Sequence, residues 1–549
     1  MSTAQQNKTP IRWHNLSISL FSALILTIWF AFDHRLAGID ESGHIINANQ
    51  AREILAHARI WKLDWWNDLL TINGFYPPFV YITNGFLRLA FTDAAWVDAL
   101  SLILFDLGLS ASVFGITWLV TKCRASSILA VVILHCYPLI SYLSHTPLLD
   151  FPLETMIALG VFSLLWWTEN LTWKRSIVCA VALALACLTK QIAVAFLLPP
   201  ALWLTAKALI EAPQSERLKV FGKALTVAFV TASAIALWFC LNRESIASLA
   251  SYNRTIIGDT SMASALIANL KFYAIGTPHN MSVLLLSLFF FALCFLGKSW
   301  KSLAPILLSA AGGMCIISLI TWTAPLDRYQ APALIAPAVV TAAAAVSLWQ
   351  GLSNQLALKT AGRLFVALAS LTIALQYLSY NFMPYPLNLG APLASIAHKL
   401  GVSVRLYRDE LVVNDSPRPA QDWGQVWTLE RIRQIDGEAP VWLNILPCTP
   451  DTNAHTFEVV AHRIKSKAKP TTSRIWTLLG DKVEFSEKTA QYYQWYLISD
   501  GNQGNQLLDQ ASNKAYSDLH DFVTKSGKFT LIDSFRLPNQ LTIKLYRQK

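Results

Sequence analysis

The stretch LSLILFDLGLSASVFGITW, residues 100–118, decides what kind of fold this chain has. Asp106 is its single charged residue, and apolar side chains make up most of the rest. A helix needs about 20 mainly apolar residues to cross the hydrocarbon core of a bilayer. The stretch therefore predicts a transmembrane helix, and similar runs recur along the chain between short polar breaks.

The overall composition agrees with this prediction. Of the 549 residues, 54% are hydrophobic and only 14% are charged, and the mean hydropathy is +0.40. A soluble protein would carry about 25% charged residues. We therefore expect an α-helical polytopic membrane protein. Nucleotide-binding glycine loops, zinc-protease motifs and the GxSxG elbow are absent from the sequence, so soluble nucleotide or hydrolase chemistry has no support.

The chain changes character near residue 382. Residues 1–382 hold 41 of the charged residues and 383–549 hold 37, so the density of charge about doubles. The C-terminal part also alternates strand-like runs such as APVWLNIL (439–446) with a polar helical pattern, KAYSDLHDFVTKSG (514–527). We predict a membrane domain, residues 1–382, followed by a small α/β domain, residues 383–549.

Basic residues in the short connections predict the orientation, because cytoplasmic loops are enriched in Lys and Arg. Alternate connections each carry at least two cations, including Lys8 and Arg12, Lys122 and Arg124, and Lys298 and Lys301. These connections lie before or between eleven predicted membrane spans, near 15–35, 96–120, 125–143, 152–168, 175–190, 192–209, 223–241, 281–297, 303–323, 330–350 and 364–382.

The basic residues place the N-terminus in the cytoplasm. Because the number of predicted spans is odd, the C-terminal domain is then outside, as in a bacterial inner-membrane protein. The first outer loop then covers residues 36–95, and 242–280 form another. YPPFVYITNGFLRLAF (76–91) could be a further span, but counting it would reverse every later loop. We therefore predict that 76–91 lies in the membrane interface. Seven of the eight cysteines lie in or beside apolar runs, so we expect no disulfide framework.

Two adjacent carboxylates, Asp40 and Glu41, follow the first span in GIDESGHIINANQAREIL (38–55). His44 would share a helix face with Asp40, since residues four apart lie on one side. Acidic residues at a helix start also simply favour the helix dipole. A capping role and a functional role are both open at this point.

The second outer loop adds Asp150, directly before the next span in LSHTPLLDFPLETM (143–156), with His145 close by. Asp150 could be an N-cap. Two carboxylates at matched depth could equally serve as a general base, as a cation site or as both.

Two cations appear on the side where positive charge is disfavoured. Lys190 lies in LACLTKQIAVAFLLPP (185–200) and Arg328 in WTAPLDRYQAPALIAP (322–337), both in short outer turns. Each alone could be a snorkelling side chain. Together, next to acidic residues, they predict a site for an anion such as phosphate. Asp106 could line a proton path, but a structural hydrogen-bonding role is the interpretation we favour.

The order of these motifs resembles the GT-C superfamily of membrane glycosyltransferases. It is similar to bacterial protein O-mannosyltransferase-like and lipid A aminoarabinose transferase-like proteins over roughly residues 10–350. The motifs that carry the likeness are DE (40–41), AREIL (51–55), YPP (76–78), LLDFP (148–152), CLTKQIAVAFLLPP (187–200) and DRYQAPALIAP (327–337).

The resemblance implies roles for individual residues. Asp40 corresponds to the catalytic carboxylate of the first outer loop, with Glu41 as the alternative, and Asp150 to a second acidic position that in some relatives helps to hold a divalent metal. The positions expected to contact substrate are His44, Tyr76, Pro77, His145, Lys190, Arg328 and Tyr329. No cofactor is certain, although a divalent cation on Asp40 and Asp150 is possible on this likeness.

The resemblance also implies a reaction. We expect transfer of a sugar from a polyprenyl-phosphate donor to a hydroxyl or amine of a lipid, glycan or protein on the outer face, with inversion. Ser-Gly-His after the DE pair, and Tyr76 in place of a charged residue, argue against 4-amino-arabinose as the sugar. A secondary transporter and a polymerase or ligase of polyprenyl-linked glycans are the alternatives. Nucleic acid is not an expected partner, but membrane lipids are.

The C-terminal domain is expected to shape acceptor choice and not to carry the chemistry. Its QYYQWY segment (491–496) could contact sugar, but alternating rings in a buried strand are the interpretation we favour.

Overall fold

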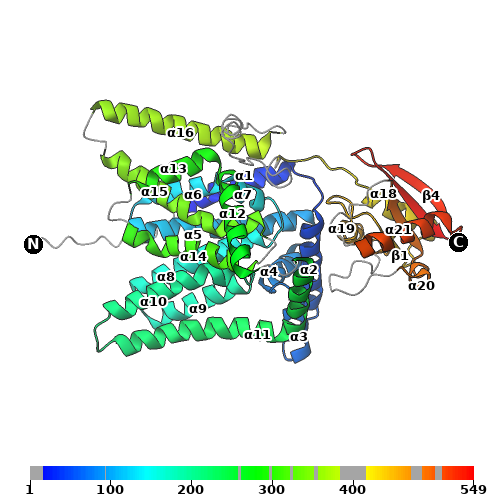
Figure 1. Ribbon diagram of the computed structural model, residues 1–549, viewed down its shortest axis with the longest axis horizontal. Coiled ribbons are helices and arrows are strands. Elements are labelled where there is room, and N and C mark those ends of the chain that lie inside the picture. The colour runs from blue at the N-terminus through cyan, green and yellow to red at the C-terminus, as the bar shows by residue number, and fades with distance from the viewer. Residues whose placement is uncertain are drawn as a thin grey trace, which may run out of the picture.

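Long helices and a small sheet make up the computed structural model, which describes residues 16–92, 94–257, 261–295, 300–321, 325–351, 356–383, 416–471, 485–500 and 510–549. Lys8, Arg12 and Lys298 of the predicted cytoplasmic connections, and residues 384–415 of the predicted C-terminal domain, lie outside the described residues. The chain is an α-helical polytopic membrane protein with a sheet-containing C-terminal domain (Figure 1).

The helices before the C-terminal domain are α1 (Leu16–Phe32), α2 (Ile39–Ala56), α3 (Leu63–Leu70), α4 (Phe79–Phe91), α5 (Ala95–Thr121), α6 (Arg124–His135), α7 (Pro138–Ser144), α8 (Asp150–Glu169), α9 (Trp173–Cys187), α10 (Ala193–Glu211), α11 (Arg217–Ile257), α12 (Met262–Met281), α13 (Val283–Leu293), α14 (Trp300–Ile320), the 3-10 helix η3 (Asp327–Leu334), α15 (Ile335–Gly351) and α16 (Leu356–Phe382).

Among the described residues, six helices are long and apolar enough to cross a membrane, or up to eight if each of two bent pairs is one span. One pair, α6 and α7, bends by 75° just before Pro138, whose ring cannot continue a helix without losing a hydrogen bond. The other pair, α12 and α13, bends by 106° at Ser282, which has a φ of 69°.

The six to eight candidate spans in the described part of the chain are fewer than the eleven predicted spans. The segments 15–35 and 175–190 form helices of only 17 and 15 residues, α1 and α9. The segment 281–297 is the second half of the bent pair α12–α13. Its first half, with the end of α11, fills the predicted outer loop 242–280. Polar residues in α12, such as Asn269 and His279, interrupt its apolar pattern, so the sequence does not show it as a continuous apolar run.

The two ends of the helical bundle differ in charge. Lys122 after α5 pairs with Glu169 at the end of α8, and a pocket of about 240 Å³ beside them is also lined by Lys207 and Lys301. Asp150 lies at the other end of α8. Basic connections that the sequence assigns to one side of the membrane thus gather at one end, and the acidic residues of the outer loops lie at the opposite end.

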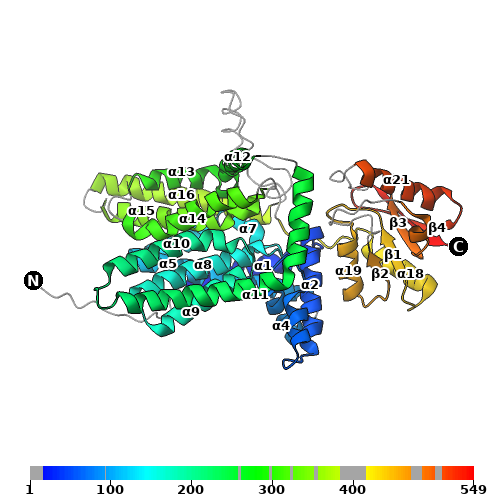
Figure 2. The same ribbon diagram turned by 60° about the horizontal axis from the view of Figure 1, so that its bottom comes forward.

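An outer layer formed by α2, α3 and α4 covers that acidic end. In both views α2 runs across the end of the bundle, between the bundle and the C-terminal domain (Figures 1 and 2). α4 packs tightly on α2, because a Cβ atom at Gly85 would lie 2.9 Å from the Cβ atom of Ala51. α4 has 13 residues, too few to span a bilayer, and Phe86 and Leu89 on its outer side are exposed, which suits the predicted interfacial position.

The described part of the C-terminal domain contains α18 (Gln425–Asp436), β1 (Trp442–Ile445), α19 (Ala454–Arg463), β2 (Lys469–Thr471), α20 (Glu487–Ala490), β3 (Trp495–Ser499), α21 (Gln510–Lys525), β4 (Phe529–Arg536) and β5 (Thr542–Gln548). Its five described strands have the order β2-β1-β3-β5-β4, with β1, β2 and β3 parallel and the other two pairings antiparallel.

Alternate residues of β3 point to two separate hydrophobic cores on the two faces of this sheet. Trp495 and Leu497 belong to one core, and Tyr496 and Ile498 to the other. Only Trp495 and Tyr496 of QYYQWY lie in this strand, as predicted, and Tyr493 is buried in the turn before it. Tyr492, in contrast, has 58% of its surface exposed.

The C-terminal domain contacts the outer layer through α19. The Nδ1 atom of His455 lies 3.4 Å from the carbonyl oxygen of Ile39, one residue before Asp40. At the other end of α19, Arg463 lies 3.5 Å from Asp98 of α5, which also pairs with the buried Arg88 of α4. The start of α19 therefore lies above the acidic end of the bundle.

Candidate active site

Four charged side chains meet at the outer end of the bundle. Asp40 comes from the first turn of α2 and Asp150 from the first residue of α8, where the helix dipoles favour negative charge. Lys190 lies in the turn between α9 and α10, and Arg328 lies in η3. The structure thus brings together residues separated by almost 290 positions in the chain.

Arg328 lies between the two carboxylates. Its Nη1 and Nη2 atoms both donate to Oδ2 of Asp40 at 3.2 Å. Its Nε atom lies 3.5 Å from Oδ2 of Asp150. The side chain of Asp150 is only 2% exposed, whereas that of Asp40 is 59% exposed. The two carboxylates therefore face one site, but only Asp40 is open to an incoming molecule.

Lys190 is the fourth charged residue of the cluster and pairs with Asp150. Its Nζ atom donates to Oδ1 of Asp150 at 2.7 Å and lies over the rings of Tyr76 and Tyr329, at 5.5 and 4.8 Å from their centres. Such ring faces attract cations. Burial lowers the pKa of Lys190, and Arg328 adds to this, while the carboxylate of Asp150 opposes it. Two cations and two carboxylates thus form a charge-balanced quartet.

The YPP segment is held against the turn that carries Lys190. The backbone N–H of Phe79 donates to the carbonyl of Leu188 at 3.1 Å, and the side chain of Gln191 donates to the carbonyl of Phe75. Pro77, which follows Tyr76, is buried. These contacts fix the ring of Tyr76 beside Lys190.

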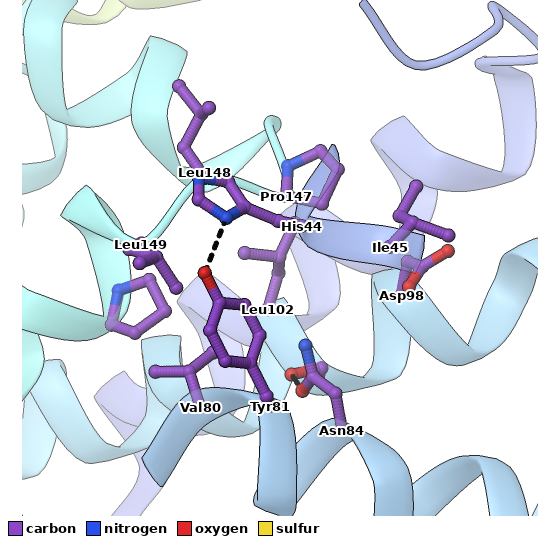
Figure 3. A pocket seen from close by; sticks show the side chains of 12 residues that line it. His44, Ile45, Val80, Tyr81, Asn84, Asp98, Leu102, Pro147, Leu148 and Leu149 are labelled. Carbon is purple, nitrogen blue, oxygen red and sulfur yellow. Dashed lines mark hydrogen bonds between the residues drawn. The ribbon is translucent and has the colours of Figure 1, made fainter. Parts of the chain in front are cut away.

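His44 lies one turn after Asp40 and is hydrogen-bonded to Tyr81 of α4, with 2.9 Å between Nδ1 and the phenol oxygen (Figure 3). Its ring centre is 5.8 Å from that of Tyr76. Burial, followed by the positive charge of Lys190, lowers the pKa of His44 to about 4, so the imidazole is neutral at pH 7. His44, Tyr81, Asn84 and Asp98 also line a cavity of about 10 Å³, the size of one water molecule.

Two predicted site residues have other contacts. An oxygen of Glu41 accepts the backbone N–H of Gly38 at 2.7 Å and so caps the start of α2. The ring of His145 stacks on Trp29 of α1, with ring centres 3.8 Å apart. The bond of Glu41 to Gly38 is that of a helix cap, and the stacking of His145 places its ring against α1.

Tyr81 was missed by sequence reasoning, whereas the spacing of four residues predicts that Glu154 faces the same way as Asp150. Tyr81 was treated only as part of an apolar segment, because its partner His44 lies on another helix. Glu154, one turn after Asp150, is fully buried, and neither of its carboxylate oxygens has a hydrogen-bond partner in the described part of the chain. Asp106 is bonded to Ser22 of α1 and to His135 of α6, both at 2.7 Å, which agrees with the structural role favoured for it.

The residues present do not resemble a metal centre. No group of three or more His, Cys, Asp or Glu side chains that could hold a metal ion occurs among the described residues. The guanidinium of Arg328 supplies the positive charge between Asp40 and Asp150, in the position where a cation bridging the two would lie.

Three solved structures share the fold of this chain. ArnT from Cupriavidus metallidurans, a lipid A aminoarabinose transferase, matches in its apo state with a TM-score of 0.55, at 14% identity, over 96% of this chain and 97% of that one. The same protein bound to undecaprenyl phosphate gives a TM-score of 0.56 with the same identity and coverage. The arabinofuranosyltransferase AftD from mycobacteria gives 0.51 at 12% identity, over 98% of this chain and 40% of that one.

No protein-family model matches the chain, and no curated protein matches it in sequence. The structural matches confirm the predicted resemblance to the GT-C superfamily at the level of the fold, because ArnT and AftD are both members of it.

Proposed function

We propose that this chain, which has the GT-C fold, is an integral-membrane glycosyltransferase that moves a sugar from a polyprenyl-phosphate donor to an acceptor hydroxyl or amine. The acceptor belongs to a lipid, a glycan or a protein. The proposed setting is a bacterial inner membrane, with the N-terminus in the cytoplasm and the quartet and the C-terminal domain on the outer face. The basic end of the bundle supports this orientation.

One observation carries the proposal, namely that Arg328 joins an accessible carboxylate, Asp40, to a buried ion pair, Asp150–Lys190. A sugar transferase of this kind needs a base where the acceptor enters and positive charge where the phosphate leaves. The quartet offers both within one cluster at the end of an apolar bundle. The structure of ArnT with undecaprenyl phosphate supports a lipid phosphate as the group bound.

The proposed reaction is a direct displacement. Asp40 accepts the proton of the acceptor hydroxyl. At the same time the oxygen of that hydroxyl attacks the anomeric carbon of the donor sugar from the side opposite the phosphate. The bond between that carbon and the phosphate oxygen breaks, and the electron pair stays on the polyprenyl phosphate. Lys190 and Arg328 stabilise this developing charge. Attack from the opposite side inverts the anomeric centre.

Asp150 has a different proposed role. Its carboxylate is buried and bonded to Lys190, so it orients the cations and does not exchange protons with the acceptor. Tyr76 and Tyr329 flank Lys190, and neutral His44 with Tyr81 lies beside them, where uncharged hydrogen-bonding groups suit a sugar.

Binding of the lipid phosphate tests the site independently of the acceptor. We expect undecaprenyl phosphate to raise the thermal unfolding temperature of the detergent-solubilised wild-type protein, since a ligand of the native state stabilises it. Arg328→Gln should abolish this shift, and Arg328→Lys should retain part of it. Lys122→Gln, at the opposite end of the bundle, is the matched control and should keep the full shift. A full shift in Arg328→Gln would contradict the proposal.

Removal of divalent cations should leave the transfer rate unchanged. Arg328 and Lys190 already neutralise both carboxylates, so the proposed chemistry does not need a cation between them. The measurement is transfer from a labelled polyprenyl-phosphate sugar before and after dialysis against a chelator. Loss of transfer that Mg²⁺ restores would show that a bound cation, and not Arg328 alone, serves Asp40 and Asp150.

A further inference from the structure

A rigid apolar tip lies at the far end of α2. We use the name "57–66 tip" for residues 57–66, which contain the connection from α2 to α3 and the first turn of α3. Residue 57 lies 17 residues after Asp40, so at 1.5 Å per residue the tip begins about 26 Å along the helix from Asp40. Four large side chains of the tip are exposed, namely Ile60 by 62%, Trp61 by 78%, Leu63 by 86% and Trp66 by 44%.

These side chains are exposed because the local structure holds them outward. Trp65 is buried, and its Nε1–H donates to the carbonyl of Ile54 at 2.8 Å. The Nε1–H of Trp66 donates to the carbonyl of Ile60 at 2.8 Å, and the backbone N–H of Lys62 donates to the carbonyl of Arg59 at 2.8 Å. The tip is therefore a fixed shape and not a frayed helix end.

α3 has two apolar faces. Trp65 and Leu69, four residues apart, form the face that is buried against the rest of the protein. Leu63 and Trp66, three residues apart, form a second face that points outward. A helix with apolar residues on both sides is normally covered on both sides. Water alone is therefore an unfavourable environment for the outward face.

The outward face lies next to a helix that is long and apolar enough to span a membrane. The segment Arg217–Ser248 of α11 is this candidate span, and its exposed side chains include Phe229, Leu237 and Leu241. The residue after Leu241, Asn242, donates its side-chain N–H to the carbonyl of Leu70 at the end of α3. Figure 1 places α3 at the edge of the outer layer, beside α11.

The composition of the tip matches the headgroup region of a bilayer. Two tryptophans lie next to Arg59 and Lys62, which are exposed. Tryptophan concentrates at the membrane interface, where one part of the ring is apolar and another accepts water, and Lys and Arg contact lipid phosphates there. A lipid surface would cover the exposed apolar side chains of the tip and those of the neighbouring candidate span together.

We propose that the 57–66 tip inserts into the headgroup region of the outer leaflet and anchors the far end of α2 to the bilayer. The partner is the lipid surface itself, bound by Ile60, Trp61, Leu63 and Trp66. α2 is then fixed at one end by the bilayer and at the other by the Asp40–Arg328 pair. The proposal is independent of the proposed reaction, since it concerns the position of α2 and not the chemistry.

A fluorescent label on the tip tests the proposal in the full-length chain. The six cysteines that are not buried are replaced by Ser, and Trp61→Cys is labelled with an environment-sensitive fluorophore in vesicles of phosphatidylethanolamine and phosphatidylglycerol. A nitroxide lipid quenches labels at headgroup depth, and iodide quenches labels in water. Tyr492→Cys, exposed on the C-terminal domain, is the matched control, and Leu63→Cys repeats the test if Trp61→Cys fails to fold.

We expect blue-shifted emission and strong quenching by the nitroxide lipid for the label at position 61, and quenching by iodide alone at position 492. Equal iodide quenching at both positions would overturn the proposal, because the tip would then lie in water. Protection at position 61 from both quenchers would also overturn it, since a protein partner or a second copy of the chain would then cover the tip.

Discussion

Asp40→Asn abolishes measurable transfer while the lipid phosphate still binds. The substitution keeps the size of the side chain but removes its ability to take a proton, and loss of a general base lowers turnover by roughly 10²–10⁴-fold. Lys190 and Arg328, the proposed phosphate ligands, are unchanged in this variant, and Arg328 loses one of its two carboxylate partners. The measurement is release of polyprenyl phosphate from a labelled donor, with the thermal shift by undecaprenyl phosphate measured in parallel.

Glu41→Gln is the matched control for this prediction. Its carboxylate accepts the backbone N–H of Gly38 and caps its own helix, so an amide oxygen can replace it. We expect nearly wild-type turnover in this variant. The opposite pattern, with an active Asp40→Asn and an inactive Glu41→Gln, would make Glu41 the base and contradict the role proposed for Asp40.

Asp150→Asn lowers the stability of the protein as well as its activity. Lys190 is 3% exposed, and its ammonium group would lose the negative charge of the carboxylate whose oxygen now lies 2.7 Å away. Breaking a buried ion pair from one side costs about 3–5 kcal/mol, because the remaining charge stays buried without a partner. We expect a clear fall in the thermal unfolding temperature of the solubilised protein.

The double variant Asp150→Asn with Lys190→Met separates charge from packing. It removes both members of the pair, so it should regain much of the stability lost in the single variant while remaining inactive. A single variant that unfolds at the wild-type temperature would show that the Asp150–Lys190 pair does not hold a buried charge. A double variant less stable than the single one would assign the effect to packing.

The sequence predicted the quartet because of where its members lie in the chain. Asp40, Asp150, Lys190 and Arg328 each follow or precede an apolar run, and the charge bias of the loops assigns all four to one side of the membrane. The side of the membrane and the depth at which a residue lies follow from such patterns, because each span must cross the whole bilayer. The contact of Arg328 with both carboxylates is a finding of the structure, because the pattern does not say which helices are neighbours.

Glu41 and His145 show that a sequence pattern does not predict the direction of a side chain. Glu41 and Asp40 are adjacent, but successive helical residues point in different directions, and only one of the two reaches Arg328. His145 lies five residues before Asp150, yet the turn between α7 and α8 directs its ring toward Trp29. The bend at Ser282 has no sequence signal of its own, since neither Gly nor Pro occupies that position.

The balance of charge in the quartet has a consequence for the end of the proposed reaction. A phosphodiester donor carries one negative charge, whereas the departing phosphate monoester carries up to two at neutral pH. When Asp40 has taken the proton, Lys190 and Arg328 face only one carboxylate, and the cluster holds the doubly charged product. In the proposed reaction the two cations therefore hold the spent lipid carrier more tightly than they hold the donor, and its departure becomes the slower of the two release steps.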